Sequence, residues 1–540
     1  MKTEKTEKKI EIYDTTLRDG TQAENFNLSV RDKIKVTRKL DELGIDFIEG
    51  GWPGSNPLAV EYFKAMQDEK LNHAVLTAFG STRHFKNRVE EDPTLQALLK
   101  AETGALTVFG KTWDIHVHDA LRIELEDNLE IIEDSLSFLR RHVDRLIYDA
   151  EHFFDGFKNN REYALKTIDA AINGGADTVV LCDTNGGTLP QEIPDIITTM
   201  QEHLAARGAE VKLGIHTHND SEVAVANSLM ALSMGVDQVQ GTINGYGERC
   251  GNANLTSILP AVVFKMGLGC EAGRRIDKLY STSRLVNELA NLAHNRYQPY
   301  VGESAFAHKG GIHVSAVKRN PLTYEHIEPE KVGNIRRILI SDQAGKSNVL
   351  HKAGKYGLQL ADDDPIISSI VSTLKEQENR GYQYEGAEAS FELLMRRALG
   401  LQRRFFKLEG FRVINYKYRM DRAPLTEATI RLFVGGHEVH TASMGDGPVN
   451  ALDNALRKAL TRFYPKLAEM ELIDYKVRVL SGEHGTGASV RVLIESKDRD
   501  CQWGTVGVSI NIIEASWQAL VDSINYKLMK DEKLTPGDTA

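Results

Sequence analysis

The sequence predicts an α/β protein in which a (β/α)₈ TIM barrel is followed by a helical connector and a small α+β domain. Three observations predict this order. Short β-rich runs alternate with amphipathic helical runs from residue 9 to about 270, residues 271–400 have a mostly helical pattern, and residues 401–540 contain an internal repeat. We therefore expect three parts, with the boundaries 1–270, 271–400 and 401–540.

The barrel prediction depends on eight β-rich runs separated by helices. The first helix has clear end signals, because Ser29 is an expected N-cap with Asp32 three residues later and Gly44 closes the helix. The alternative is an open doubly wound sheet, but the segment after Ile12 lacks the Gly-rich phosphate turn typical of that fold. The predicted strands are residues 10–17, 47–52, 74–79, 105–109, 145–149, 178–182, 211–218 and 238–243.

The connector is predicted to be helical with two hinges. Residues 279–293 and 366–374 are amphipathic at the helical period. Residues 361–365 and 381–386 are rich in Asp, Pro, Gly and Tyr and are expected to separate helices.

The C-terminal part repeats itself with an offset of sixty residues. Each copy reads as a pair of strands that leads through a Gly turn into a helix, so two β-β-α units should form a pseudo-symmetric domain. With Gly447 and Gly507 at the helix starts, the seams can hold a small ligand, or the duplication can serve dimerisation alone. Ala428, Ile430, Arg431, Leu432 and Val434 recur as Ala488, Val490, Arg491, Val492 and Ile494, and Gly447, Leu452, Ala455, Ala459 and Leu460 recur as Gly507, Ile512, Ala515, Ala519 and Leu520.

Composition excludes several classes of protein. The chain has 41% hydrophobic and 26% charged residues, and its 66 basic and 76 acidic residues give a formal net charge of −10, so it has no general footprint for nucleic acid. The four cysteines form no C-x-x-C pair, which favours a reducing compartment. The charged N-terminus and the lack of an apolar run of ~18 residues predict no secretory signal and no membrane span, so we expect a cytoplasmic location.

Two strand ends supply candidate metal ligands. In a (β/α)₈ barrel the chemistry lies at the C-terminal ends of the strands. His216 and His218 at the end of the seventh strand point to the same face, where they can share a metal ion or simply hydrogen-bond to each other. Asp19 follows the first strand and can be a third ligand, because odd strands share interior layers; otherwise it belongs to a surface Asp-Gly turn.

Other polar residues lie at the same end of the predicted barrel. Asn252 stands in a Gly-rich loop after the eighth strand and offers an amide oxygen to a hard cation. Glu49, Glu151 and Thr184 follow strands two, five and six, and each is either a site residue or a solvated rim residue. Beyond the barrel, residues 305–313 contain two His, one Lys and two Gly, which is typical of a functional loop.

Three runs of the chain resemble one family. Residues 14–22, 216–220 and 244–252 together look like the DRE-TIM metallolyases, whose condensing members are the 2-isopropylmalate, homocitrate and citramalate synthases. The resemblance covers nearly the whole chain, and the C-terminal repeat is similar to the regulatory domain of the isopropylmalate and citramalate synthases. Within the family, residues 48–57 and 308–316 are most similar to the long type of (R)-citramalate synthase, whereas residues 148–154 are more aromatic than the usual pattern.

The resemblance implies a role for each candidate residue. The barrel is then catalytic, and the last domain is regulatory and dimerising. Residues of the post-barrel segment reach into the neighbouring subunit's barrel in a homodimer. The implied metal ligands are Asp19, His216, His218 and Asn252, the implied catalytic residues are Arg18, Glu151, His313 and Tyr324, and the implied substrate-binding residues are Arg18, Glu49, Thr184 and Asn320.

The implied reaction is a Claisen-type condensation of acetyl-CoA with pyruvate that gives (R)-citramalate and CoA and serves isoleucine biosynthesis. It requires a divalent metal ion, with Mg²⁺, Mn²⁺ and Zn²⁺ all open, and isoleucine is the implied inhibitor. The first alternative is a 2-isopropylmalate synthase, which accepts 2-ketoisovalerate in leucine biosynthesis. Further alternatives are a retro-Claisen lyase, which resembles the barrel alone, and a metal-stabilised binding protein without activity.

Overall fold

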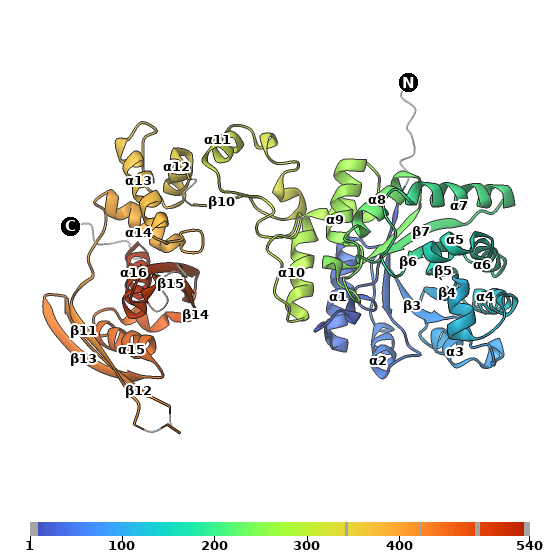
Figure 1. Cartoon of the computed structure of the whole chain (residues 1–540), viewed down its shortest axis with the longest axis horizontal. Helices are drawn as coiled ribbons and strands as arrows, with labels where there is room; N and C mark the ends of the chain where they lie inside the picture. The colour runs from blue at the N-terminus through green and yellow to red at the C-terminus, as the bar shows by residue number, and fades with distance from the viewer. Residues whose placement is uncertain (1–8, 341–343, 419, 422, 481–486, 534–540) are drawn as a thin grey trace. The chain divides into compact units, whose positions relative to one another are not determined.

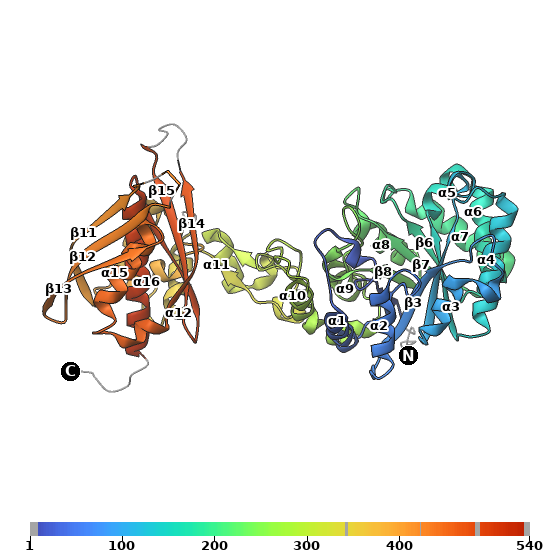
Figure 2. The same ribbon diagram turned by 90° about the horizontal axis from the view of Figure 1, so that it is seen from below.

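The computed structural model describes residues 9–340, 344–418, 420–421, 423–480 and 487–533. It divides the chain into two compact units (Figures 1 and 2). The first unit comprises residues 1–306 and 326–336, and the second comprises residues 307–325 and 337–540.

The first unit contains a closed barrel of eight parallel strands in chain order, so the predicted barrel is confirmed. Every strand pairs with the next one, and β1 pairs with β8 to close the ring. All eight predicted strands are present. They are β1 (Glu11–Asp14), β2 (Phe47–Gly51), β3 (Val75–Ser81), β4 (Ala105–Lys111), β5 (Arg145–Glu151), β6 (Thr178–Asp183), β7 (Lys212–Thr217) and β8 (Gln238–Gly241).

Helices follow the strands and cover the outside of the barrel (Figure 1). The first one has the ends that the sequence predicts, because Ser29 and Asp32 form a reciprocal capping box and Gly44 ends the helix with φ 90°. The helices of this unit are α1 (Val30–Leu43), α2 (Pro57–Met66), α3 (Pro93–Lys100), α4 (Leu125–Arg140), α5 (Phe153–Asn159), α6 (Arg161–Asn173), α7 (Ile193–Arg207), α8 (Ala224–Ser233), α9 (Leu255–Ala261) and α10 (Leu279–Leu289).

The second unit begins with a short two-stranded sheet and four helices. Strands β9 (Ala307–His308) and β10 (Arg337–Ile338) are parallel. The helices are α11 (Gly311–Arg319), α12 (Lys346–Lys355), α13 (Pro365–Asn379) and α14 (Glu388–Ala398). A buried cluster that includes Phe391 of α14 and Val506 of the last sheet joins this segment to the C-terminal repeat. The segment and the repeat therefore share a hydrophobic core.

Each copy of the repeat contains three antiparallel strands and one helix, one strand more than the two predicted. The extra strand comes first in each copy, at β11 and β14. The elements are β11 (Phe406–Tyr416), β12 (Leu425–Val434), β13 (His437–Gly445) and α15 (Pro448–Leu460), then β14 (Glu471–Val479), β15 (Val490–Lys497), β16 (Gln502–Ser509) and α16 (Ile512–Lys533). Helix α15 packs on its own sheet, α16 packs on the other, and the helices contact each other, so the layers run sheet, helix, helix, sheet (Figure 2).

The expected position of Gly507 at a helix start is wrong. Gly447 is indeed the N-cap of α15, but Gly507 lies inside β16. The first turn of α16 is capped instead by Asn511, whose Oδ1 accepts hydrogen bonds from Ile513 N at 2.8 Å and Glu514 N at 3.3 Å. Gly507 is small for a different reason, because a Cβ at this position would lie 2.0 Å from Ala515 O of α16.

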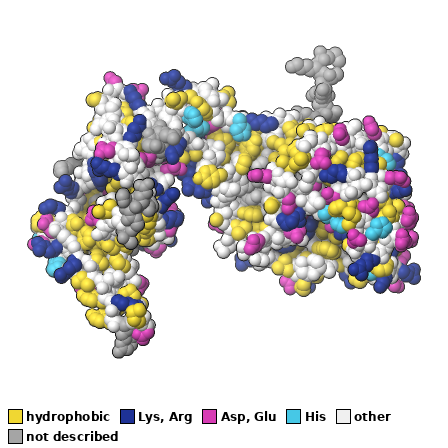
Figure 3. Space-filling model, viewed as in Figure 1, with side chains coloured by type: hydrophobic (Ala, Val, Ile, Leu, Met, Phe, Trp, Pro, Cys, Tyr) yellow, Lys and Arg dark blue, Asp and Glu magenta, His cyan; other side chains and the backbone are white. Residues whose placement is uncertain are grey.

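The surface carries both charge signs. Basic and acidic side chains are interspersed over the face shown in Figure 3, in agreement with the sequence composition. Within the described part of the chain, no helix is long and apolar enough to cross a lipid bilayer.

Candidate metal centre and active site

Three side chains converge at the C-terminal end of the barrel, as the strand ends predict. Asp19 follows β1, His216 lies in β7 and His218 follows it. The two His Nε2 atoms are 3.2 Å apart, and Asp19 Oδ2 lies 3.4 Å from His216 Nε2 and 3.6 Å from His218 Nε2. All three residues are buried, and one ligand atom from each lies within 4.8 Å of the others. Two imidazoles and one carboxylate at this spacing suit a divalent ion with open positions.

The charges of this cluster are strongly coupled. Burial would raise the pKa of Asp19, but the Arg18 guanidinium and the two histidines hold it well below its ordinary value. Burial, together with the charge of His216, lowers the pKa of His218 to about 4. The pKa of His216 is raised, because the hydrogen bond and charge of Asp19 outweigh its burial. At neutral pH the site therefore contains a carboxylate and at least one neutral imidazole, which are the forms that bind metals.

A polar chain that the sequence reading missed orients His216. His216 Nδ1 lies 2.8 Å from Gln240 Oε1, and Gln240 Nε2 donates to Asp149 Oδ1 at 3.0 Å. Because the amide oxygen can only accept, the neutral form of His216 carries its proton on Nδ1, which leaves the lone pair of Nε2 directed toward the cluster. Gln240 is fully buried in β8, and burial raises the pKa of Asp149 to about 7.

Asn252 lies against the cluster and has an unused oxygen. Its backbone forms a single antiparallel β-bridge with that of His218. Its side-chain Nδ2 lies 2.9 Å from Asp19 Oδ2 and 3.2 Å from His216 Nε2. Its Oδ1 is buried and has no hydrogen-bond partner among the described residues. Turning the amide over would present this oxygen to the site, so the donor set fits a hard or borderline cation.

Arg18 is held rigidly beside these residues. Its Nε donates to Glu49 Oε1 at 2.5 Å, and its guanidinium stacks 3.8 Å from the centre of the Phe79 ring. Glu49 is completely buried and also accepts hydrogen bonds from Tyr13 and Thr15. Because its oxygens are already bonded, Glu49 has the geometry of a residue that positions Arg18 rather than one that contacts substrate directly.

Glu151 and Thr184 are each engaged by a neighbour. Glu151, at the end of β5, accepts a hydrogen bond from Lys111 at the end of β4, a partner that the sequence reading did not identify. The Thr184 hydroxyl accepts from His152 N at 2.9 Å. Lys111 adds a positive charge near a carboxylate, which suits a site for an anionic substrate.

The three residues expected beyond the barrel lie in the second unit. The rings of His313 and Tyr324 stack, with centroids 4.1 Å apart and planes at 30°. Asn320 ends α11, and its Oδ1 accepts from Leu322 N at 3.1 Å. Ile312 and Leu322 beside them are 80% and 73% exposed. This part of the unit therefore exposes two large apolar side chains next to an accessible imidazole.

Three family models match successive parts of the chain. The HMGL-like family model matches residues 9–286, the model described as a homocitrate synthase post-HMGL domain matches residues 300–381, and the LeuA allosteric (dimerisation) domain model matches residues 385–528.

Several curated relatives match over almost their whole length. The (R)-citramalate synthase of Geobacter sulfurreducens is 59% identical over 97% of this chain and 98% of that protein, and that of Aquifex aeolicus is 54% identical over 97% and 99%. A probable 2-isopropylmalate synthase of Methanopyrus kandleri is 32% identical over 96% of this chain and 98% of that protein. The chain therefore belongs to the HMGL-like family and, within it, to the (R)-citramalate synthases.

Proposed function

We propose that the chain is an acyl-transferring enzyme that condenses acetyl-CoA with pyruvate to give (R)-citramalate and CoA. The observation that carries this proposal is the 59% identity to a curated (R)-citramalate synthase over 97% of the chain, against 32% for a probable 2-isopropylmalate synthase. The buried Asp19–His216–His218 cluster supplies a fitting site for the chemistry.

The metal ligands are Asp19, His216, His218 and Asn252, and the ion is divalent, with Mg²⁺ or Mn²⁺ favoured by the oxygen ligands and Zn²⁺ compatible with the histidines. When bound, such an ion would supply Lewis-acid chemistry for the keto group of the acceptor. The chain's own residues do the remaining work. Arg18, fixed by Glu49, places a permanent positive charge where an oxygen becomes negative, and Glu151 with Lys111 and Thr184 orient the keto acid.

His313 is proposed as the base that removes a methyl proton from acetyl-CoA, with Tyr324 and Asn320 positioning it. Its exposed ring, stacked on Tyr324 and flanked by exposed Ile312, suits a residue that completes a site in another subunit. The match to the LeuA allosteric (dimerisation) domain supports a homodimer in which active sites are shared. The same match supports feedback control, for which isoleucine is the proposed effector.

Competitive turnover tests the acceptor. The full-length protein is given equal pyruvate and 2-ketoisovalerate with acetyl-CoA and each candidate metal, and the products are separated and quantified. Citramalate should dominate, and product formation should stop after exhaustive chelation and return with the divalent ion. A preference for 2-ketoisovalerate would make the chain a 2-isopropylmalate synthase instead. Full turnover after chelation would contradict the metal assignment.

A further inference from the structure

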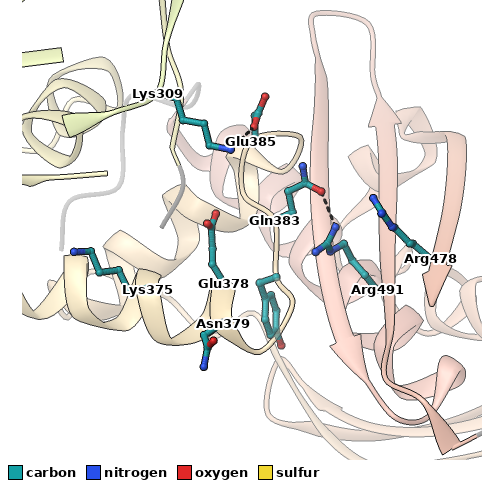
Figure 4. A pocket seen from close by; sticks show the side chains of 9 residues that line it. Lys309, Lys375, Glu378, Asn379, Gln383, Glu385, Arg478 and Arg491 are labelled. Carbon is teal, nitrogen blue, oxygen red and sulfur yellow. Dashed lines mark hydrogen bonds and ion pairs between the residues drawn. The ribbon is translucent and has the colours of Figure 1, made fainter. Parts of the chain in front are cut away.

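A cavity of about 750 Å³ lies in the second unit, and none of its lining residues has been given a role in the reaction above (Figure 4). Helix α13 and the loop after it form one wall, and strands β14 and β15 form the other. The lining includes the bases Lys309, Lys375, Arg478 and Arg491 and two acids, Glu378 and Glu385. The volume is in the usual range for small-molecule sites, ~300–1,000 Å³.

Two arginines lie directly opposite each other in the wall formed by β14 and β15. Arg478 on β14 and Arg491 on β15 are register partners of the antiparallel pair, and both side chains extend toward the loop that carries Gln383 (Figure 4). Like charges at directly opposed positions destabilise a sheet. The pKa of Arg491 is lowered by its burial and by the charge of Arg478, and Glu378 offsets only part of this effect.

The described residues leave Arg478 without a counter-ion. Arg491 donates to Gly381 O at 2.5 Å and to Gln383 Oε1 at 2.7 Å, both of which are neutral acceptors. Glu385 is engaged by Lys309 at 3.3 Å. Within the described residues, the exposed side chain of Arg478 has neither an ion pair nor a hydrogen bond.

The other copy of the repeat provides an internal comparison. The two copies correspond in space at an offset of 64 residues rather than sixty, because the bulges after Leu408 and Leu472 are equivalent, as are the hydrogen bonds from Thr441 to Ala455 O and from Thr505 to Ala519 O. At this offset the counterparts of Arg478 and Arg491 are Ile414 and Glu427, which are also register partners of an antiparallel pair. The second copy therefore has two guanidinium groups where the first copy has an apolar side chain and an acid.

We propose that the Arg478–Arg491 cavity binds a phosphate-bearing small molecule. Paired guanidinium groups match the several oxygens of a phosphate or diphosphate. Lys309 and Lys375 add positive charge at the rim, and the remaining volume accommodates the organic part of the ligand. The phosphate can belong to a free phosphorylated metabolite or to coenzyme A, which carries both a diphosphate and a phosphate ester.

The test is calorimetric titration of the full-length protein with pyrophosphate. The protein is first treated with a chelator, so that pyrophosphate cannot bind through a metal ion. The wild-type protein should bind it, and Arg478→Gln should weaken the affinity at least about tenfold, as expected for a lost charge-assisted bond. Arg431→Gln is the control and should bind like the wild type, because Arg431 is an exposed arginine of the other sheet that is paired with Glu438. Equal affinity of the wild type and Arg478→Gln, or an equal loss in Arg431→Gln, would overturn the proposal.

A second variant separates ligand binding from folding. Arg478→Glu places an acid opposite Arg491, so its Tm without ligand should exceed that of the wild type, while pyrophosphate should raise the Tm of the wild type only. A pyrophosphate-induced rise of the same size in Arg478→Glu would contradict the site.

Competition identifies the source of the phosphate. Displacement of pyrophosphate by CoA, with a raised KM for acetyl-CoA in Arg478→Gln, assigns the site to the substrate. Displacement by ADP but not by CoA, with an unchanged KM, assigns it to a separate effector. The comparison of KM values rests on the proposed function, because it requires turnover of acetyl-CoA. The pyrophosphate titration measures binding alone and does not depend on that function.

Discussion

At the scale of single residues, Gln240 determines which nitrogen His216 presents to the metal site. Its amide oxygen fixes the proton on Nδ1, and Asp149 holds the amide from the other side. Outer partners of this kind typically contribute 10–100-fold to metal affinity.

We expect Gln240→Leu to weaken divalent-metal binding by about 10–100-fold while the protein remains folded. Gln238→Leu is the matched control, because Gln238 is equally buried on the same strand but donates to Glu11 instead. Calorimetric metal titration with circular dichroism checks both variants. The same loss in both variants would show a general effect on the barrel rather than a role in orienting His216.

Metal binding should release one proton, not two, near pH 6. His216 is mostly protonated there, because its pKa is raised above 6.5, while the pKa of His218 is lowered to about 4 and that of Asp19 lies still lower. Affinity should therefore rise about tenfold per pH unit until the pKa of His216 is passed, and then level off. Titrations in buffers of different ionisation enthalpy count the protons, and a count of two would contradict this assignment.

At the scale of elements, the two glycines that the sequence places at helix starts have different surroundings in the structure. Gly507→Ala should destabilise the protein by about 1–3 kcal/mol, because the added methyl group would collide with the backbone of α16. Gly447→Ala should be nearly neutral, since no atom lies within 4 Å of a Cβ at that position. Thermal unfolding of the two variants measures the contrast, and similar Tm values would contradict it.

The predictable elements are those with a local signal. The barrel strands have β-rich runs, α1 has its cap at Ser29, and Asp19, His216 and His218 follow strand ends, so both the barrel and the three-residue cluster could be predicted. Gln240 and Lys111 could not, because a single polar residue on a strand has no pattern that separates a buried partner from a solvated one. Strands β11 and β14 were missed because the matches by which the repeat was recognised begin at Ala428 and Ala488, after both strands.

At the scale of the whole molecule, shared active sites predict complementation between inactive variants. His313→Ala should lower kcat by about 10²–10⁴-fold, and Arg18→Ala should inactivate the barrel it belongs to. Mixed and exchanged subunits should regain part of the activity, because some hybrid sites combine an intact His313 with an intact Arg18. Activity is assayed after subunit exchange has been demonstrated independently. If no activity is recovered, His313 and Arg18 act in the site of a single subunit and the shared site is contradicted.

The discontinuous second unit also constrains how the molecule can be rebuilt from related genes. The chain leaves the first unit after Phe306, re-enters it at His326 and leaves again after Arg336. A chimera with one crossover between residues 308 and 337 would therefore take β9 from one parent and its pairing partner β10 from the other. A functional exchange of the C-terminal part therefore requires residues 307–325 to be exchanged with it. The His313 segment and the repeat are expected to be inherited together, although residues 326–336 of the first unit lie between them in the sequence.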